Sequence, residues 1–149
     1  MRGFNMYDKS ITLFCFNEEQ GKWYPYVLND VDFGANKGVN TSTTGDTDSD
    51  RTIVLVKSDK RKKIITESEI ISYLPPKEYQ RTLKPQKHFT FTPGKDFICD
   101  GIYEDLSAVT DDEYESGFYH YMNKNRDGVY LITSADYFSL LPHFELEAK

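Results

Sequence analysis

Residues 10–28 have the sequence SITLFCFNEEQGKWYPYVL, which carries the strongest fold signal in the chain. Its first half alternates apolar with smaller or polar residues and then becomes wholly apolar, as a strand entering a core does. A polar stretch ending at Gly21 leads into Lys22 to Leu28, which is rich in aromatic residues. The pair predicts an antiparallel hairpin with a loop longer than two residues. Because Pro25 has no amide hydrogen, we expect it at an edge or a bulge of the second strand.

Strand patterns continue along the rest of the chain. Arg51 to Lys57 is the clearest strand, and together with residues 63–66 it predicts a second hairpin across a charged turn. Further strands are expected at residues 88–92, 97–103, 128–133 and 143–147. We also expect a short helix beginning at Pro76, and a connector, or one helical turn, at 134–140. Many short strands separated by turns predict a mainly β fold, a small β-barrel or sandwich with antiparallel hairpins.

Two segments interrupt this pattern. Residues 34–50, GANKGVNTSTTGDTDSD, hold too little apolar surface to offset the entropy of ordering, so we expect a long mobile loop. Thr110 to Glu113 fits a capping box, which predicts one inserted helix at about residues 111–123. On that helix Tyr114, Phe118, Tyr121 and Met122 recur at helical spacing and are expected to face the domain.

Length and composition limit the classes of protein that fit. At 149 residues the chain predicts a single domain, residues 1–149. Its formal net charge of −6 disfavours nucleic acid or an anionic membrane as the main partner. We also expect a soluble protein without a signal peptide, because no stretch approaches the ~20 apolar residues that cross a bilayer. In a reducing compartment Cys15 and Cys99, each flanked by apolar residues, are expected to be buried free thiols.

The sequence offers no convincing catalytic or metal site. Asp46, Asp48 and Asp50 resemble the start of a calcium loop, but Arg51 and Lys57 stand where that loop needs Gly and Glu, so we favour a solvated acidic loop. The three histidines lie far apart without metal-ligand spacing, and neither a nucleophile elbow nor a phosphate-binding glycine loop is present. We therefore expect no enzyme activity, no catalytic residue, no metal and no cofactor.

The remaining candidates are contact residues. Candidate phosphate contacts are Lys60, Arg61, Lys62 and Lys63, although a charged turn that protects a sheet edge is the favoured interpretation. Candidate partner contacts are Trp23, Tyr24, Asp46, Asp48, Asp50, Tyr119 and Tyr121, and the Tyr137-Phe138 pair is a further one. For each aromatic residue the sequence leaves a core role and an interface role equally open.

Several ordered segments resemble a known group of phage proteins. The segments are Ile11 to Phe14, Trp23 to Pro25, Val27 to Val31, Tyr73 to Tyr79, Phe91 to Asp96, Ile132 to Ser134, and Leu141 to Lys149. In order and spacing they resemble minor capsid or head–tail joining proteins of phages and prophages of Gram-positive hosts, the group that includes the head–tail stopper. The segment Glu104 to Asn125 departs from that group, in which a shorter connection is expected.

The resemblance implies a small β-barrel that forms a homo-oligomeric ring in the virion, after assembly in the host cytoplasm. It implies partners on the portal or adaptor side and on the tail side, proximity to DNA, help in retaining packaged DNA, and no membrane. In this setting the 34–50 loop becomes a contact or channel element. The isolated chain is compatible with a monomer. The alternative hypothesis is a small soluble phage protein that binds and inhibits a host nucleic-acid enzyme.

Overall fold

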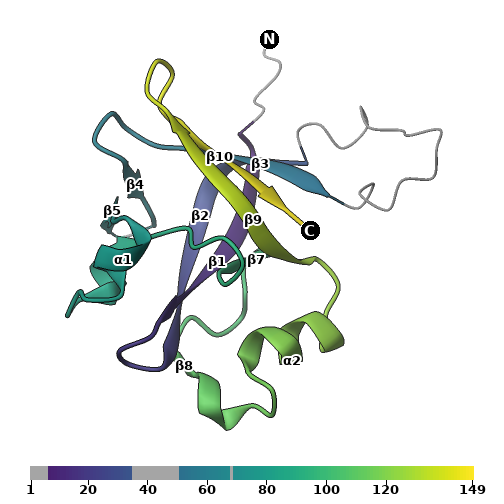
Figure 1. Cartoon of the computed structure of the whole chain (residues 1–149). Helices are drawn as coiled ribbons and strands as arrows, with labels where there is room; N and C mark the ends of the chain where they lie inside the picture. Colours follow the sequence, from purple (N-terminus) through teal and green to yellow (C-terminus); the bar gives the residue numbers. More distant parts are fainter. Residues whose placement is uncertain (1–6, 35–50, 68) are drawn as a thin grey trace, which may run out of the picture.

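A closed antiparallel β-barrel forms the centre of the molecule in the computed structural model, which describes residues 7–34, 51–67 and 69–149 (Figure 1). The barrel strands are β1 (Lys9–Asn17), β2 (Lys22–Phe33), β3 (Thr52–Lys57), β7 (Phe97–Asp100), β9 (Val129–Phe138) and β10 (His143–Ala148). They follow the order β1-β7-β9-β10-β3-β2, and pairing of β2 with β1 closes the ring. A short extra strand, β8 (Val109–Thr110), pairs with the start of β2. The prediction of a mainly β fold with antiparallel hairpins is confirmed, in its barrel form.

The N-terminal hairpin forms as predicted. Pro25 lies opposite Phe14 of β1. On the other edge of β2, β8 pairs only with Lys22 and Trp23, and β3 only with residues 31–33. In the described part of the chain, Pro25 therefore has no strand partner on this edge, as its missing amide hydrogen requires.

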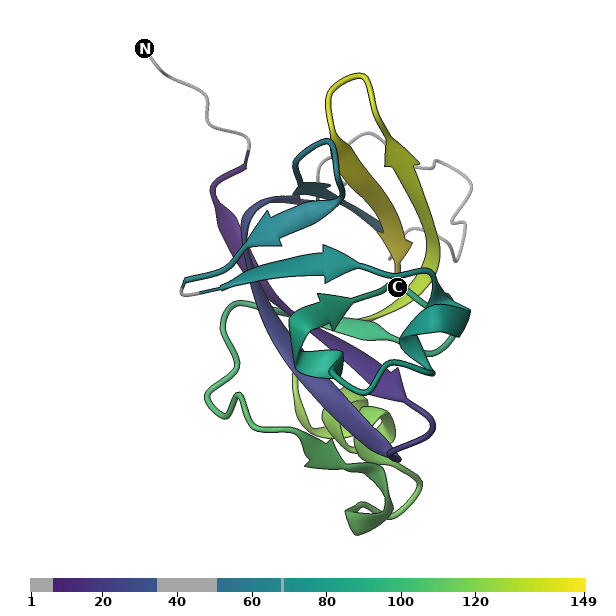
Figure 2. The same cartoon turned by 90° about the vertical axis from the view of Figure 1, so that its left-hand side faces the viewer.

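The second predicted hairpin is wrong. Strand β3 pairs with β10 and with the end of β2, whereas β4 (Lys63–Ile65) belongs to a separate three-stranded sheet with β5 (Ile70–Tyr73) and β6 (His88–Phe89). Strand β4 cannot join β3 because both edges of β3 are already paired, with β10 along its whole length and with β2 at residues 54–56. Asp59 Oδ1 fixes the turn that follows β3, since it accepts the backbone N–H groups of Arg61 and Lys63 at 2.8 and 2.9 Å. The chain leaves the barrel here, and the small sheet lies outside β2 (Figure 2).

The inserted helix begins later than predicted. Helix α2 spans Phe118–Asn125, and Asp111–Glu113 is a separate 3₁₀ turn, η3, without a side-chain cap from Thr110. Asp111 lies outside the helix and caps it, because its Oδ1 accepts the N–H of Phe118 at 2.9 Å. The break falls at Gly117, whose φ of 94° is a conformation that favours glycine.

Other predicted boundaries have mixed outcomes. Helix α1 (Pro76–Tyr79) begins at the expected proline and precedes the 3₁₀ helix η2 (Pro85–Lys87). The prediction of a connector at 134–140 is wrong, because β9 continues as a strand to Phe138. No helix of the described residues has the length and apolar character to cross a membrane. Residues 35–50, which include nearly all of the expected mobile loop, lie outside the described residues.

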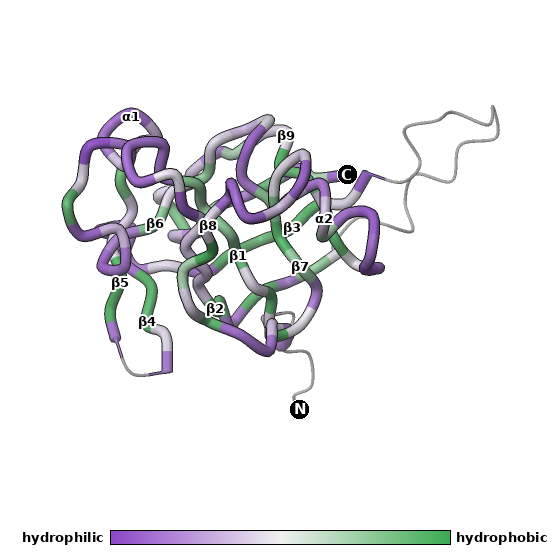
Figure 3. The backbone as a smooth tube through the Cα atoms, turned by 90° about the horizontal axis from the view of Figure 1, so that it is seen from below, coloured by the Kyte–Doolittle hydropathy of each residue, from purple (hydrophilic) through white to green (hydrophobic). Residues whose placement is uncertain are grey.

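Alternating side chains of β1 divide the core into two clusters. Ile11, Leu13 and Cys15 belong to the larger cluster, together with Val54 and Leu146 of the facing strands. Phe14 belongs to the second cluster, which contains Trp23, Phe97, Phe118 and Met122 and lies beneath α2. Both faces of β1 are therefore covered, which explains why Ile11 to Cys15 are all buried. Figure 3 shows the apolar character concentrated along the barrel strands.

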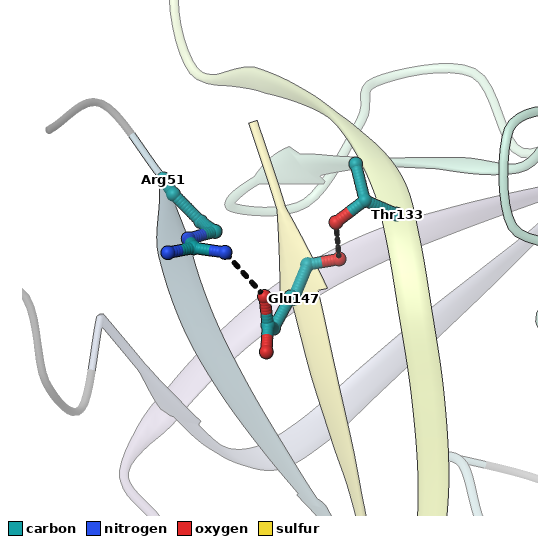
Figure 4. A network of polar contacts seen from close by, with 3 residues as sticks. All are labelled: Arg51, Thr133 and Glu147. Atoms are coloured by element: carbon teal, nitrogen blue, oxygen red, sulfur yellow. Dashed lines mark hydrogen bonds and ion pairs between the residues drawn. The ribbon is translucent and has the colours of Figure 1, made fainter. Parts of the chain in front are cut away.

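Polar contacts also join neighbouring strands at one end of the barrel. Arg51, just before β3, pairs with Glu147 of β10 at 3.0 Å, and Thr133 of β9 donates its hydroxyl to the Glu147 carbonyl oxygen at 3.1 Å (Figure 4). Both charged groups are exposed, so the ion pair contributes less than about 1 kcal/mol. The packed aromatic core, not this network, supplies the main stability of the barrel.

Candidate interaction surface

The turn between β9 and β10 carries an unusual exposed apolar group. Phe138 pairs with His143 at the end of the hairpin, leaving a four-residue turn, Ser139 to Pro142. Leu140 and Leu141 are 92% and 77% exposed, and Phe138 is 45% exposed. Turns normally carry Gly, Asn, Asp or Ser, and a cluster of exposed large apolar side chains marks a contact surface. We call Phe138, Leu140 and Leu141 the apolar tip; its turn projects beyond the barrel in Figure 1.

Contacts within the hairpin and from the next strand hold the apolar tip in place. The ring of Phe138 stacks on the ring of His143, with centroids 5.1 Å apart and planes 14° apart. Nδ1 of His143 lies 2.6 Å from the carbonyl oxygen of Leu141, so the tautomer protonated at Nδ1 donates to it. Ser58 donates its backbone N–H to the carbonyl of Pro142 at 3.3 Å. A turn already fixed in this way loses little conformational entropy when a partner binds.

Positive charge gathers beside the apolar tip. The four candidate phosphate contacts span the turn from β3 to β4 and the first residue of β4, a segment that we call the basic turn (Lys60–Lys63), and Lys57 precedes it. Lys62 places Nζ 4.8 Å from the ring centroid of Tyr137, which itself donates to the Asp59 carbonyl at 3.2 Å. Asp59, the acidic residue next to the basic turn, already accepts two backbone N–H groups through its carboxylate. The apolar tip and the basic turn therefore lie side by side.

A groove of about 450 Å³ follows the unpaired edge of β2. We call it the β2 groove. Its apolar lining includes Val27, Ile71, Ile102, Leu106 and Ala108, and its polar lining includes Tyr24, Thr66, Glu67, Glu69 and Gln86. Glu69 pairs with Lys87 at 3.2 Å, and Glu67 has no ion pair among the described residues. The groove therefore combines apolar walls with an acidic rim.

The predicted partner contacts do not gather in one place. Trp23 is 1% exposed and donates Nε1–H to Asp111 at 2.8 Å, so of the two roles that the sequence leaves open it has the core one, and its candidacy as a partner contact is wrong. Tyr24 is half-buried and lines the β2 groove. Tyr119 is half-buried against Phe97, whereas Tyr121 is exposed on α2. Asp46, Asp48 and Asp50 lie outside the described residues.

Sequence analysis missed Leu140 and Leu141. The segment 134–140 was expected to be a connector, and apolar residues in a connector are usually buried. The available signal was local: two adjacent leucines and a proline stand between two strands, without a glycine or asparagine in the turn. Phe138, by contrast, was flagged as a contact candidate and is exposed.

The buried titratable groups serve the fold. Burial raises the pKa of Asp96 to about 7, although its carboxylate accepts the backbone N–H groups of Phe16 at 3.1 Å and Thr92 at 2.9 Å. The cysteines are free and buried, as predicted, and burial raises the thiol pKa of Cys15 strongly and that of Cys99 to about 12. Among the described residues, no three His, Cys, Asp or Glu side chains are grouped to hold a metal ion. Asp96 thus ties the Thr92–Asp96 turn to the end of β1.

Comparison with known proteins gives a family for nearly the whole chain. A family model, described as a family of unknown function (DUF6751), matches residues 6–149. No curated protein and no solved structure matches the chain.

Proposed function

We propose that this chain, which belongs to the DUF6751 family of unknown function, is a structural subunit of the head–tail connector of a tailed phage. In this role it binds other neck and tail proteins, on the portal or adaptor side and on the tail side. It acts without catalysis, helps to retain packaged DNA, and forms a ring with other copies of itself in the virion.

The observation that carries the proposal is the preorganised apolar tip. Leu140 and Leu141 are almost fully exposed on a turn that three contacts hold in place, which suits a surface made to bind a protein. The ordered resemblance to head–tail joining proteins supports the same role, and so does the barrel form of the fold. The acidic net charge of −6 suits a channel through which DNA must slide without sticking.

Particle assembly tests this function directly. Deleting the gene from the phage that encodes it is expected to leave unjoined heads and tails in electron micrographs, and wild-type particles are expected to contain the protein by mass spectrometry. The double variant Leu140→Asp/Leu141→Asp should fail to complement the deletion. Leu83→Asp is the matched control, because Leu83 is also 83% exposed but lies outside the apolar tip and the β2 groove. Normal tailed particles from the deletion strain would overturn the proposal.

A second function is favoured by the basic turn alone. Four consecutive cationic residues, Lys60 to Lys63, in an acidic protein fit a small phage protein that binds and inhibits a host nucleic-acid enzyme. Affinity capture from host lysate distinguishes the two functions. If the wild type captures a polymerase or nuclease and a Lys60→Glu/Arg61→Glu variant does not, the inhibitor function is supported. If the wild type captures virion proteins from infected cells, the connector function is supported.

A further inference from the structure

We infer that copies of this chain join head to tail, with the apolar tip of one copy seated in the β2 groove of the next. The inference rests on the proposed function, because it names the contact that would build the proposed ring. Both surfaces belong to one chain and are preformed: the tip is a fixed turn, and the groove follows the unpaired middle of β2.

The two surfaces match in size and in polarity. An apolar cavity of about 150 Å³ holds a benzene ring, and the β2 groove is larger, at about 450 Å³. It therefore has room for Leu140 and Leu141 together with part of the Phe138 ring. The walls meet these residues through their exposed side chains, because Ile71 is only 1% exposed and belongs to the core. Two of the wall residues, Ile102 and Leu106, are more than half exposed in the single copy, so both partners leave apolar surface uncovered.

Charge decides between the possible ways of pairing two copies. Lys57 and the basic turn lie beside the apolar tip, and at the β2 groove stand Glu67, which has no ion pair among the described residues, and Glu69, which is paired with Lys87. A tip-to-tip contact would bring two basic turns together, and a groove-to-groove contact would bring two unpaired glutamates, one Glu67 from each copy, together. Only the tip-to-groove arrangement sets opposite charges against each other, which disfavours a contact between two like surfaces and favours the pairing that we infer.

The positions of the two surfaces allow this arrangement to continue from copy to copy. In Figure 2 the turn of β9 and β10 projects at the top, and the segment around residues 102–108 lies on the far side of the β4–β5 hairpin. One copy can therefore bind a neighbour through its tip and another through its groove. Repetition of such a contact generates a closed ring or a filament, depending on the angle between copies. The unpaired edge of β2 beside the groove adds main-chain hydrogen-bonding groups for the incoming turn.

Complementation between two defective variants tests the contact. The tip variant is Leu140→Asp/Leu141→Asp, and the groove variant is Ala108→Trp, which fills the groove from an exposed position. Each change should weaken self-association at least about 30-fold in sedimentation velocity, as substitution of a central interface residue does. An equimolar mixture should nevertheless form dimers that do not grow, because the tip variant keeps its groove and the groove variant keeps its tip. Leu83→Asp should associate like the wild type.

Disulfide trapping detects the same contact even when it is weak. Chains carrying Leu141→Cys and chains carrying Ala108→Cys should form mixed disulfide dimers under mild oxidation, whereas Leu83→Cys with Ala108→Cys should not. The natural cysteines are buried and do not compete. Far-ultraviolet circular dichroism of each variant checks that the barrel is intact.

Three results would overturn the inference. The first is a wild-type chain that stays monomeric and gives no mixed disulfide. The second is failure of the two variants to complement each other when the wild type associates, which indicates a symmetric contact. The third is a tip that binds anionic vesicles while copies do not associate. In each case the protein can still be found in virions, so loss of this contact and loss of the connector function are distinguished.

Discussion

The buried carboxyl group of Asp96 makes the stability of the barrel depend on pH in an unusual direction. Its side chain is fully buried where the Thr92–Asp96 turn meets the end of β1. Burial penalises the charged carboxylate and raises its pKa to about 7, while two backbone N–H donors from Phe16 and Thr92 lower it only in part. In the unfolded chain the same group has a pKa near 3.8.

The sign of the effect follows from proton binding. Below pH 4 both states hold the proton, so this group does not alter stability. Between pH 4 and pH 7 the unfolded chain has released the proton and the folded chain retains it, so the free energy of unfolding decreases as pH rises. About three pH units at 1.36 kcal/mol each set an upper limit of about 4 kcal/mol. Above pH 7 both states are ionised and the loss is complete.

The substitution Asp96→Asn isolates this term from the other titrating groups. Asparagine has one acceptor oxygen, so one backbone N–H loses its partner, and we expect a cost of about 1–2 kcal/mol at pH 4. Between pH 4 and pH 8 that difference from the wild type should shrink or reverse, because only the wild type must bury a charge at high pH. Urea denaturation at each pH, followed by the fluorescence of the single, buried Trp23, measures both curves. Parallel curves for the two proteins would refute the reasoning.

Three further predictions concern the core and its caps. Asp111→Ala should lower the free energy of unfolding by about 2 kcal/mol in the same urea assay, because the Trp23 indole N–H and the first N–H of α2 both lose their acceptor. The control Asp112→Ala, at an exposed position, should change that free energy by less than about 0.5 kcal/mol. Phe144→Ala should lower the free energy of unfolding by about 3–5 kcal/mol in thermal or urea denaturation, because the buried Phe144 ring packs on four aromatic rings. Phe138→Ala should lower it much less, because Phe138 is exposed. Both cysteines should resist a thiol reagent in native buffer and react fully in urea, since burial raises their pKa values; rapid labelling of the native protein would contradict this prediction.

Local patterns predicted the parts of the fold that local interactions build. Residues 10–28 form the expected hairpin because one short turn brings the two strands together, and Pro25 was correctly placed at an unpaired edge. The strand at 52–57 was also predicted, but its partner was not. It pairs with residues 143–148, far along the chain, and no periodicity in a single strand specifies a distant partner.

The inserted helix shows how a correct local signal can be displaced by tertiary contacts. Thr110 to Glu113 has the residues of a capping box, yet Asp111 instead binds Trp23 on β2 and caps α2 from seven residues away. The same contact explains why the sequence left Trp23 undecided between core and surface. An indole N–H needs a buried acceptor to enter a core, and that acceptor lies 88 residues further along the chain.

The candidate interaction surface was harder to predict because it arises from unequal strand lengths. Strand β2 has 12 residues, but β3 and β8 cover only its two ends, and the uncovered middle becomes one wall of the β2 groove. Likewise β9 has 10 residues, of which β7 pairs with only the first few, so the β9–β10 hairpin extends past the barrel and carries the apolar tip.

Unpaired strand edges and protruding apolar turns favour association with another chain. Proteins that do not associate normally protect such edges with charged side chains or cover them with another segment. Here the charges stand beside the two surfaces with opposite signs. Because the apolar tip lies outside the buried core, a substitution such as Leu141→Asp should weaken association without unfolding the barrel. The assembly hypothesis can therefore be tested independently of stability.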